Sequence, residues 1–233
     1  MSGAPPNLLN DDGSASVATA LMMSHHGFRR DLARFAQALS EFTQGRGEQS
    51  RIPALKEEWQ NYRGTLHGHH QAEDAGIFPN VRKEKGELAA VIEGLIADHH
   101  EIDPLLQEGD QAFAKLPDGA PAAAAVIARL ASLLGPHLAK EEAEIIPVLR
   151  NWKGFPPPAS DAEVNMFATG FAWSSHGVAD EICERVYATL PNSVSSKLPA
   201  ARAAFAERTA RVWGAQIQSG ASRTSIPDWL ASR

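Results

Sequence analysis

The chain has little of what several common protein classes need. Its 233 residues include one cysteine, Cys183, so no disulfide can form within the chain. No Lys/Arg-rich block occurs and acidic residues outnumber basic ones by 28 to 22, so the positive field that gathers nucleic acid or anionic lipid is missing. The longest apolar stretch, 122–134, is interrupted by Arg129 and is shorter than the roughly 20 residues of a membrane helix. We therefore expect no disulfide, no nucleic-acid partner and no membrane span.

Signatures of export and of several enzyme classes are missing as well. The sequence has no glycine-rich phosphate loop and no nucleophile-elbow pattern. Its first residues, Met-Ser-Gly-Ala-Pro-Pro, carry neither the basic nor the apolar segment of a secretory leader. A cytoplasmic protein is therefore expected.

Hydrophobic spacing predicts an all-α protein, since no segment shows sustained period-two alternation of β-branched residues. In 17–42, apolar residues such as Phe28, Leu32 and Phe35 recur at intervals of three and four, which places them on one helix face. Three further helices of similar length are expected over 52–79, 85–115 and 121–149. Together these four segments predict an up-down four-helix bundle.

Proline and glycine mark where this bundle ends. Three successive prolines, 156–158, follow Gly154 and cannot continue a helix, so we expect a stiff linker there. The predicted organisation is a flexible arm over 1–15, the bundle over 16–150, a Pro-rich linker over 151–160 and a C-terminal helical extension over 161–233. Within the extension, a pair of helices is expected over 161–190 and 199–218.

Tryptophans concentrate in the last third of the chain, at Trp152, Trp173, Trp213 and Trp229. Indole rings supply large apolar areas to cores and to protein interfaces. We therefore expect the extension to pack on the bundle or on a second subunit, so that a homodimer or another protein partner is a candidate.

Histidines are clustered rather than scattered. Eight of the nine fall in four groups, one on each expected bundle helix: His25 and His26; His67, His69 and His70; His99 and His100; His137. Aligning the two halves of the bundle reveals an internal repeat, in which His25 pairs with His99, and His69-x3-Glu73 pairs with His137-x3-Glu141. Each half thus supplies one histidine from its first helix and a His-x3-Glu motif from its second.

This spacing has a direct chemical meaning. Residues four apart lie on the same helix face, so the imidazole and the carboxylate of each motif project into one space. Four inward-facing helices can then surround a small volume with four imidazoles and two carboxylates, a donor set that suits two first-row transition-metal ions. The alternative is that these are surface histidines in acidic helix pairs, stabilised by contacts between residues four apart.

The adjacent histidines leave a choice of register, since His70-x3-Asp74 is itself a candidate pair. A proline lies ten residues after His69 and also ten residues after its counterpart His137, and this shared spacing favours His69 over His70. The neighbouring histidines are then expected to point about 100° away around each helix.

At these residues the chain resembles the haemerythrin-like HHE cation-binding domain family, over about 16–150. The resemblance implies a four-helix bundle with a non-haem di-iron centre, in which zinc or manganese can substitute for the two iron ions. Carried over position by position, it implies that the metal ligands are His25, His69, Glu73, His99, His137 and Glu141. The two glutamates are the expected bridges between the ions.

One position departs from the oxygen-carrying members of that family. They have a fifth histidine one turn after the third-helix ligand, and this chain has Asp103 there. The departure leaves a more open or carboxylate-rich site, closer to HHE domains that sense iron or react with oxygen or peroxide. Additional ligands, or groups that surround the ligands, are expected among Asp103, Tyr62, His70 and His100.

We therefore predict a haemerythrin-like di-iron protein that binds or reacts with a small oxidant, namely oxygen, peroxide or nitric oxide. Six protein ligands shared by two ions leave coordination positions for such a molecule. The motif does not separate binding from turnover. An oxidoreductase with unassigned catalytic residues therefore stays open beside a regulatory or iron-handling module without turnover.

Overall fold

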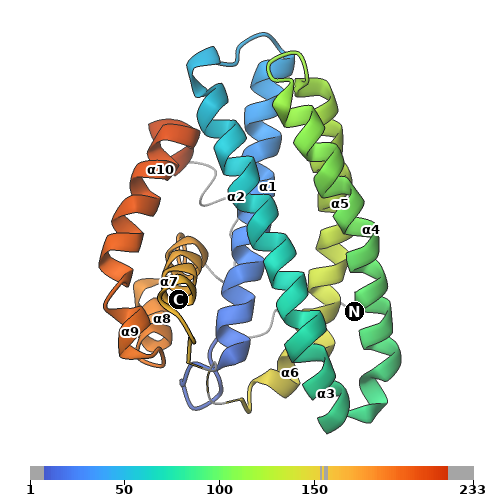
Figure 1. Cartoon of the computed structure of the whole chain (residues 1–233), viewed down its shortest axis with the longest axis vertical. Helices are drawn as coiled ribbons and strands as arrows, with labels where there is room; N and C mark the ends of the chain where they lie inside the picture. The colour runs from blue at the N-terminus through green and yellow to red at the C-terminus, as the bar shows by residue number, and fades with distance from the viewer. Residues whose placement is uncertain (1–7, 153, 155–156, 220–233) are drawn as a thin grey trace.

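The computed structural model describes residues 8–152, 154 and 157–219, and its regular structure is helical, with no strand in that part of the chain. The all-α prediction is thus confirmed. Four long helices lie side by side and alternate in direction (Figure 1): α1 (Val17–Thr43), α2 (Ile52–Ala72), α4 (Ala89–Ala114) and α5 (Ala120–Glu144). Contacts join α1 to α2, α2 to α4, α4 to α5 and α5 to α1, so these four helices, which we call the bundle, close into a ring.

Local sequence determines where these helices begin and end. The backbone N–H of Ser16 donates to Thr19 Oγ1 at 3.1 Å, a contact typical of a capped helix start. After α1, Gly45 adopts a φ of 71°, a left-handed conformation that suits glycine and ends the helix. Short 3-10 helices at Gln49–Arg51 and Gly86–Leu88 lead into α2 and α4. Pro53 lies in the first turn of α2, where a backbone N–H is not needed.

Two apolar clusters fill the bundle. The first includes Phe28, Phe35, Trp59 and Phe113, and the second includes Met22, Phe78, Leu95 and Ile146. Each long helix carries histidines or glutamates of the repeat near the middle of its buried face. Toward one end of the bundle its apolar residues belong to the first cluster. Toward the other end, the residues of the same helix or of its short continuation belong to the second cluster. The histidines and glutamates of the repeat therefore lie between two apolar layers, which exclude water from both directions.

Both His-x3-Glu motifs are followed by a break in the regular helix. After α2, residues Glu73–Ile77 form a π-helical turn, and α3 (Phe78–Glu84) follows. After α5, Ile145 is a turn residue, and α6 (Ile146–Leu149) follows. The sequence predicted unbroken helices to 79 and 149, whereas Pro79 and Pro147 each lack an N–H and would place their ring against the carbonyl four residues earlier. At Glu73–Ile77 the wider π-helical turn relieves that conflict, and after α5 the helix is interrupted at the single residue Ile145.

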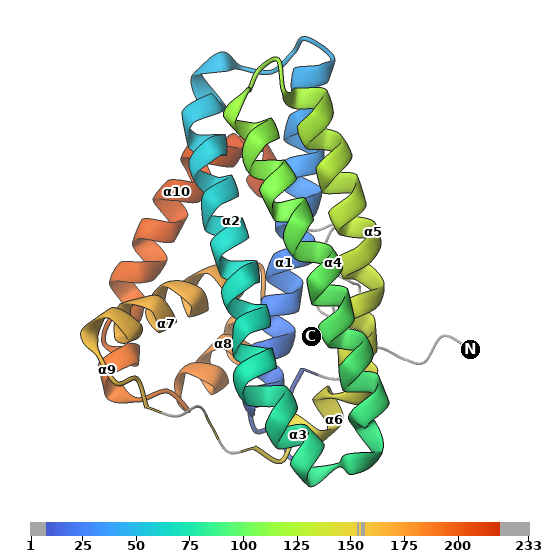
Figure 2. The same cartoon turned by 45° about the vertical axis from the view of Figure 1, so that its right-hand side comes forward.

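Within its described residues, 161–219, the extension holds four helices: α7 (Asp161–Ser174), α8 (Asp180–Tyr187), α9 (Asn192–Ser195) and α10 (Leu198–Ser219). The single helix expected over 161–190 is divided after Ser174, where Gly177 adopts a φ of 87°. Figure 2 shows that the extension covers one side of the bundle, and contacts join α7 and α10 to α1, and α10 to α2. Part of the expected linker, residues 153 and 155–156, and Trp229 lie outside the described residues.

Residues 8–14 lie against the protein rather than apart from it. Leu8 is buried, its carbonyl oxygen accepts a hydrogen bond from Thr19 Oγ1 at 2.8 Å, and the carbonyl of Leu9 accepts one from Arg150. These contacts tie Leu8 and Leu9 to α1 and to the residue that follows α6. The remainder of the expected arm, 1–7, lies outside the described residues.

A buried charged network joins the extension to α1. Asp31 accepts hydrogen bonds from Arg30, from Arg34 and, at 2.7 Å, from the indole Nε1 of Trp173 on α7. Arg30 in turn donates to the backbone carbonyls of Trp173 and His176. Burial alone would raise the pKa of Asp31, but the guanidinium of Arg30 and the other donors lower it to about 2. The network therefore keeps a negative charge where water is excluded.

The tryptophans of the extension serve the same attachment. The ring of Trp173 is 5% exposed and lies 4.9 Å from that of Phe28 between centroids, and a Cβ added to Gly27 would come within 2.7 Å of it. Trp213 is 2% exposed and lies 5.0 Å from Phe35. Because both rings are buried within one chain, neither is free to anchor a second subunit. A homodimer or other partner stays a prediction that these two residues do not support.

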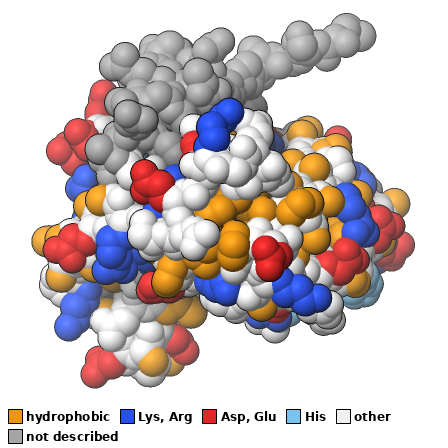
Figure 3. All heavy atoms as spheres, turned by 90° about the horizontal axis from the view of Figure 1, so that it is seen from above, with side chains coloured by type: hydrophobic (Ala, Val, Ile, Leu, Met, Phe, Trp, Pro, Cys, Tyr) orange, Lys and Arg blue, Asp and Glu red, His pale blue; other side chains and the backbone are white. Residues whose placement is uncertain are grey.

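Two features bear on the predictions about polyanions and membranes, the surface charges and the hydropathy of the helices. On the face shown in Figure 3, Lys/Arg and Asp/Glu side chains are interspersed and no extended basic area is seen. Among the described helices, α5 alone is long and apolar enough to cross a membrane by those two criteria, which core helices of soluble proteins also meet. In the bundle α5 packs against α1 and α4.

Asp31→Asn is expected to lower the free energy of unfolding by about 3 kcal/mol, because it leaves two buried guanidinium groups without their shared negative charge. Chemical denaturation of the wild type and the variant measures the change. Glu108→Gln is the matched control, since Glu108 pairs with Arg129 at side-chain exposures of 48% and 58%, where a pair contributes about 0–1 kcal/mol. Equal effects of the two substitutions would contradict the role assigned to Asp31.

Acid should weaken the attachment of the extension. Burial, followed by the positive charges of Arg30 and Arg34, lowers the pKa of His176 to about 4, against the opposing charge of Asp31. A folded pKa below the unfolded value of about 6.5 means that the neutral ring contributes stability above that pH, and that this contribution is lost as the pH falls toward 4. Between pH 7 and pH 5, the wild type should therefore lose more stability than His176→Gln in urea denaturation. Parallel losses would show that His176 is not responsible.

Candidate metal centre

The structure brings the six predicted ligands together in the interior of the bundle. They form two groups of four, one of His25, His69, Glu73 and Glu141, and one of Glu73, His99, His137 and Glu141. Within each group the donor atoms all lie within 4.8 Å of one another. Glu73 and Glu141 belong to both groups, and both are 0% exposed. Two sets of donors thus share a pair of buried carboxylates.

Each glutamate presents one oxygen to each group. The imidazole-to-carboxylate distances are 3.1 Å from His69 Nε2 to Glu73 Oε1, 3.6 Å from His99 Nε2 to Glu73 Oε2, 3.3 Å from His25 Nε2 to Glu141 Oε2 and 3.5 Å from His137 Nε2 to Glu141 Oε1. None of the four carboxylate oxygens has a hydrogen-bond partner among the described residues. A carboxylate with its two oxygens on different sides is placed to bridge two cations.

Carboxylates on the outer side orient three of the four imidazoles. The Nδ1 atoms lie 3.0 Å from Glu142 Oε1 for His25, 3.0 Å from Asp74 Oδ1 for His99 and 3.3 Å from Asp98 Oδ2 for His137. A carboxylate at Nδ1 holds the proton there and leaves the Nε2 lone pair for a metal. Motif spacing in the sequence does not predict these roles. The only signal was adjacency, because each of these acids directly precedes or follows a ligand in the chain.

Burial favours the neutral form of four of the inner donors. It raises the pKa of Glu73 well above its usual value and that of Glu141 to about 8, and it lowers the pKa values of His69 and His137 to about 4. Glu142 differs, because its hydrogen bonds to His25 and Arg29 overcome burial and hold its pKa at about 2.

These donors fit a pair of metal ions. Buried carboxylates without hydrogen-bond partners are costly, and cations between them and the neutral imidazoles would satisfy both. Nitrogen and oxygen donors without thiolates suit iron, manganese or zinc.

The four additional candidates lie in different surroundings. Tyr62 is buried and its hydroxyl has no hydrogen-bond partner in the described part of the chain; its ring contacts Phe28, which also contacts the ring of His69. Tyr62 and Asp103 belong to none of the donor groups, and His100 is exposed.

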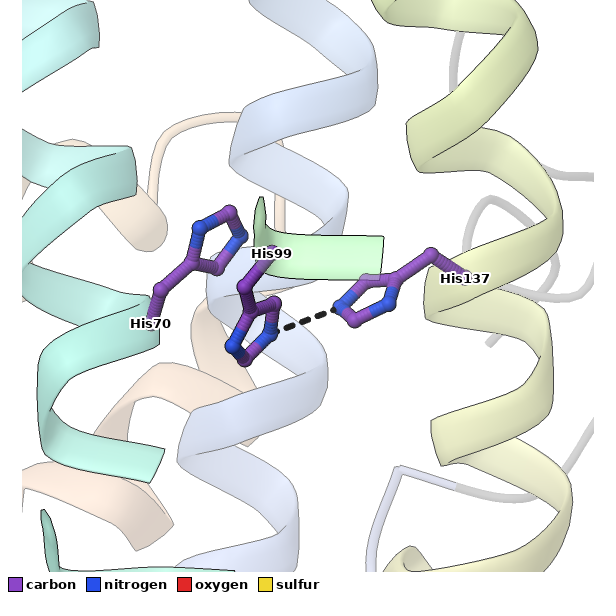
Figure 4. Close-up of side chains that lie close together, drawn as sticks. All are labelled: His70, His99 and His137. Carbon is purple, nitrogen blue, oxygen red and sulfur yellow. Dashed lines mark hydrogen bonds between the residues drawn. The ribbon is translucent and has the colours of Figure 1, made fainter. Parts of the chain in front are cut away.

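His70 does not point away as the register argument predicts. It is buried and forms a third donor group with His99 and His137 (Figure 4). The adjacent residues His69 and His70 do diverge around α2, but each of them meets a different part of the same centre.

Comparison with known families agrees with this geometry. The family model of the Hemerythrin HHE cation binding domain matches residues 16–149, more than half of the chain. The chain belongs to this haemerythrin HHE family. No significant match is found among curated proteins or solved structures. The matched range contains all six donors of the haemerythrin motif and none of the helices α7 to α10, so the family accounts for the metal-binding bundle alone.

Removing imidazoles from both donor groups should remove the metal. His69→Ala combined with His137→Ala is expected to abolish most binding of ferrous iron added anaerobically, because each group then keeps one histidine. His100→Ala, which deletes an exposed ring beside a ligand, serves as the control and should retain the wild-type metal content. Metal counted per chain by elemental analysis checks this, and equal content in all three proteins would overturn the site.

Proposed function

We propose that this protein is a haemerythrin-like up-down four-helix bundle that holds two iron ions and binds or reacts with a small oxidant. The supporting observation is the pair of donor groups joined by Glu73 and Glu141. Four histidines and two glutamates, shared by two ions, leave coordination positions for a molecule of the size of oxygen, peroxide or nitric oxide. Iron fits a carboxylate-bridged imidazole site, and zinc or manganese are the substitutes with the closest preferences.

Different residues of the chain would have different roles at such a centre. The imidazoles of His25, His69, His99 and His137 would bind the ions, and Glu73 and Glu141 would supply a carboxylate to both. The outer acids keep three rings in one tautomer, with the proton on Nδ1. The apolar layers on either side exclude bulk water from the donors. A bound iron pair supplies two neighbouring redox-active ions at which an oxidant can bind.

Size and burial favour a small ligand over an organic substrate. The donors are at most 9% exposed, at the side chain of His69, and the rings of Phe28 and Phe78 contact ligand rings from the two apolar layers.

The composition and the interspersed surface charges support a cytoplasmic protein that engages neither nucleic acid nor membrane.

Anaerobic loading with ferrous iron tests the proposal. We expect two irons per chain and a change in the optical spectrum when oxygen, peroxide or nitric oxide is added. A reversible change would indicate binding or sensing, and irreversible oxidation with consumption of peroxide would indicate an oxidoreductase. The double variant His69→Ala/His137→Ala is the blank. A loaded protein that responds to none of the three molecules would overturn the proposal.

A regulatory role without turnover is the second candidate, and one contact favours it. His25 belongs to one donor group, whereas the next residue, His26, donates through Nε2 to the carbonyl oxygen of His176 in the extension at 3.2 Å. Occupancy of the metal positions and the seating of the extension therefore act on adjacent residues of α1. Protease resistance of the extension, compared with and without iron, separates this role from simple ligand binding.

A further inference from the structure

His70 has the properties of a metal ligand although the family motif assigns it no role. It is 2% exposed, and neither ring nitrogen has a hydrogen-bond partner among the described residues. Its ring lies 4.0 Å from that of His99 and 5.7 Å from that of His137, between centroids. A donor atom of each of the three rings lies within 4.8 Å of the others (Figure 4).

Asp103 explains why this space is open to a residue of α2. It lies four residues after His99, on the same face of α4, where a histidine would reach the centre. Its side chain is instead 40% exposed, and Oδ1 lies 3.5 Å from Nδ1 of His67 and 4.0 Å from Nδ1 of His70. The carboxylate thus faces two histidines of α2 and does not join the donor groups.

The pair of His70 and Asp103 repeats an arrangement found at three other rings of the centre. His25, His99 and His137 each have a carboxylate oxygen near Nδ1, which directs Nε2 inward. At His70 the carboxylate of Asp103 is farther away, at 4.0 Å, but it also faces Nδ1. Four imidazoles therefore have an acid on the outer side, and His70 is the one for which the sequence motif gives no metal role.

We propose that His70 is a fifth imidazole ligand, bound to the metal that His99 and His137 hold, and that Asp103 orients it. The ligand is supplied by α2 in place of the histidine that α4 lacks. The two metal positions are then unequal, with three imidazoles on one and two on the other. This inference rests on the metal pair of the proposed function.

Inequality of the two positions is what the experiment measures. Anaerobic titration with ferrous iron, and in parallel with cobalt(II), gives the affinity of each position and the optical spectrum of the bound cobalt. His70→Ala is expected to lower the affinity for one of the two ions by about 100-fold, and Asp103→Asn by about tenfold. These losses lie in the range found when groups that support a metal site are removed. His100→Ala, which removes an exposed histidine next to a ligand, should leave both affinities and the cobalt spectrum unchanged.

A rescue distinguishes ligation from packing. In His70→Ala/Asp103→His, a histidine four residues after His99 restores a third imidazole from α4, and we expect the second ion and the wild-type cobalt spectrum to return. Far-UV circular dichroism checks that each variant is folded.

The outcomes separate the two proposals. Two ions bound by His70→Ala with wild-type affinity, or a folded double variant that stays at one ion, would overturn the role of His70 alone. A wild-type protein that binds fewer than two ions would overturn the proposed function and this inference with it.

Discussion

The burial of two carboxylates, Glu73 and Glu141, is the constraint on which the rest of the bundle depends. Neither side chain is exposed, and neither has a hydrogen-bond donor from the described residues. An apolar interior tolerates such groups only when protons or cations compensate them. The imidazoles that face them, the acids behind those imidazoles and the apolar layers at both ends can all be understood as responses to these two oxygen pairs.

The repeat made most of this arrangement predictable from the sequence. His69 and Glu73 are four residues apart and recur as His137 and Glu141, so helical periodicity alone places them on common faces. Periodicity could not show that His70 turns toward the centre, because the direction of a side chain next to an inward-facing residue depends on how helices α2 and α4 pack. The roles of Glu142, Asp74 and Asp98 could not be predicted for the same reason. Each role depends on the distance from the carboxylate to an imidazole on another helix.

The extension was harder to predict than the bundle. The spacing of 161–190 is helical, but Gly177 with its positive φ divides that segment. The charged network around Asp31 has no sequence signature either. Arg30 and Arg34 look like the polar face of an amphipathic helix until α7 covers Arg30 and Trp213 of α10 covers Arg34. α1 therefore has two buried faces, one toward the donor groups and one toward the extension, and it joins the family's motif to a region that the family model does not cover.

The π-helical turn at Glu73–Ile77 sets the rotational phase of everything that follows it in α3. A turn of this kind contains one residue more than an α-helical turn, which advances the downstream side chains by about 100°. With that advance, Phe78 and Val81 reach the core. In a helix without the additional residue, Phe78 and Val81 would face a different direction. The second apolar cluster would then lose two of its buried side chains. The direction of the α3 side chains thus depends on one additional residue in a turn that begins at Glu73, the carboxylate common to both donor groups.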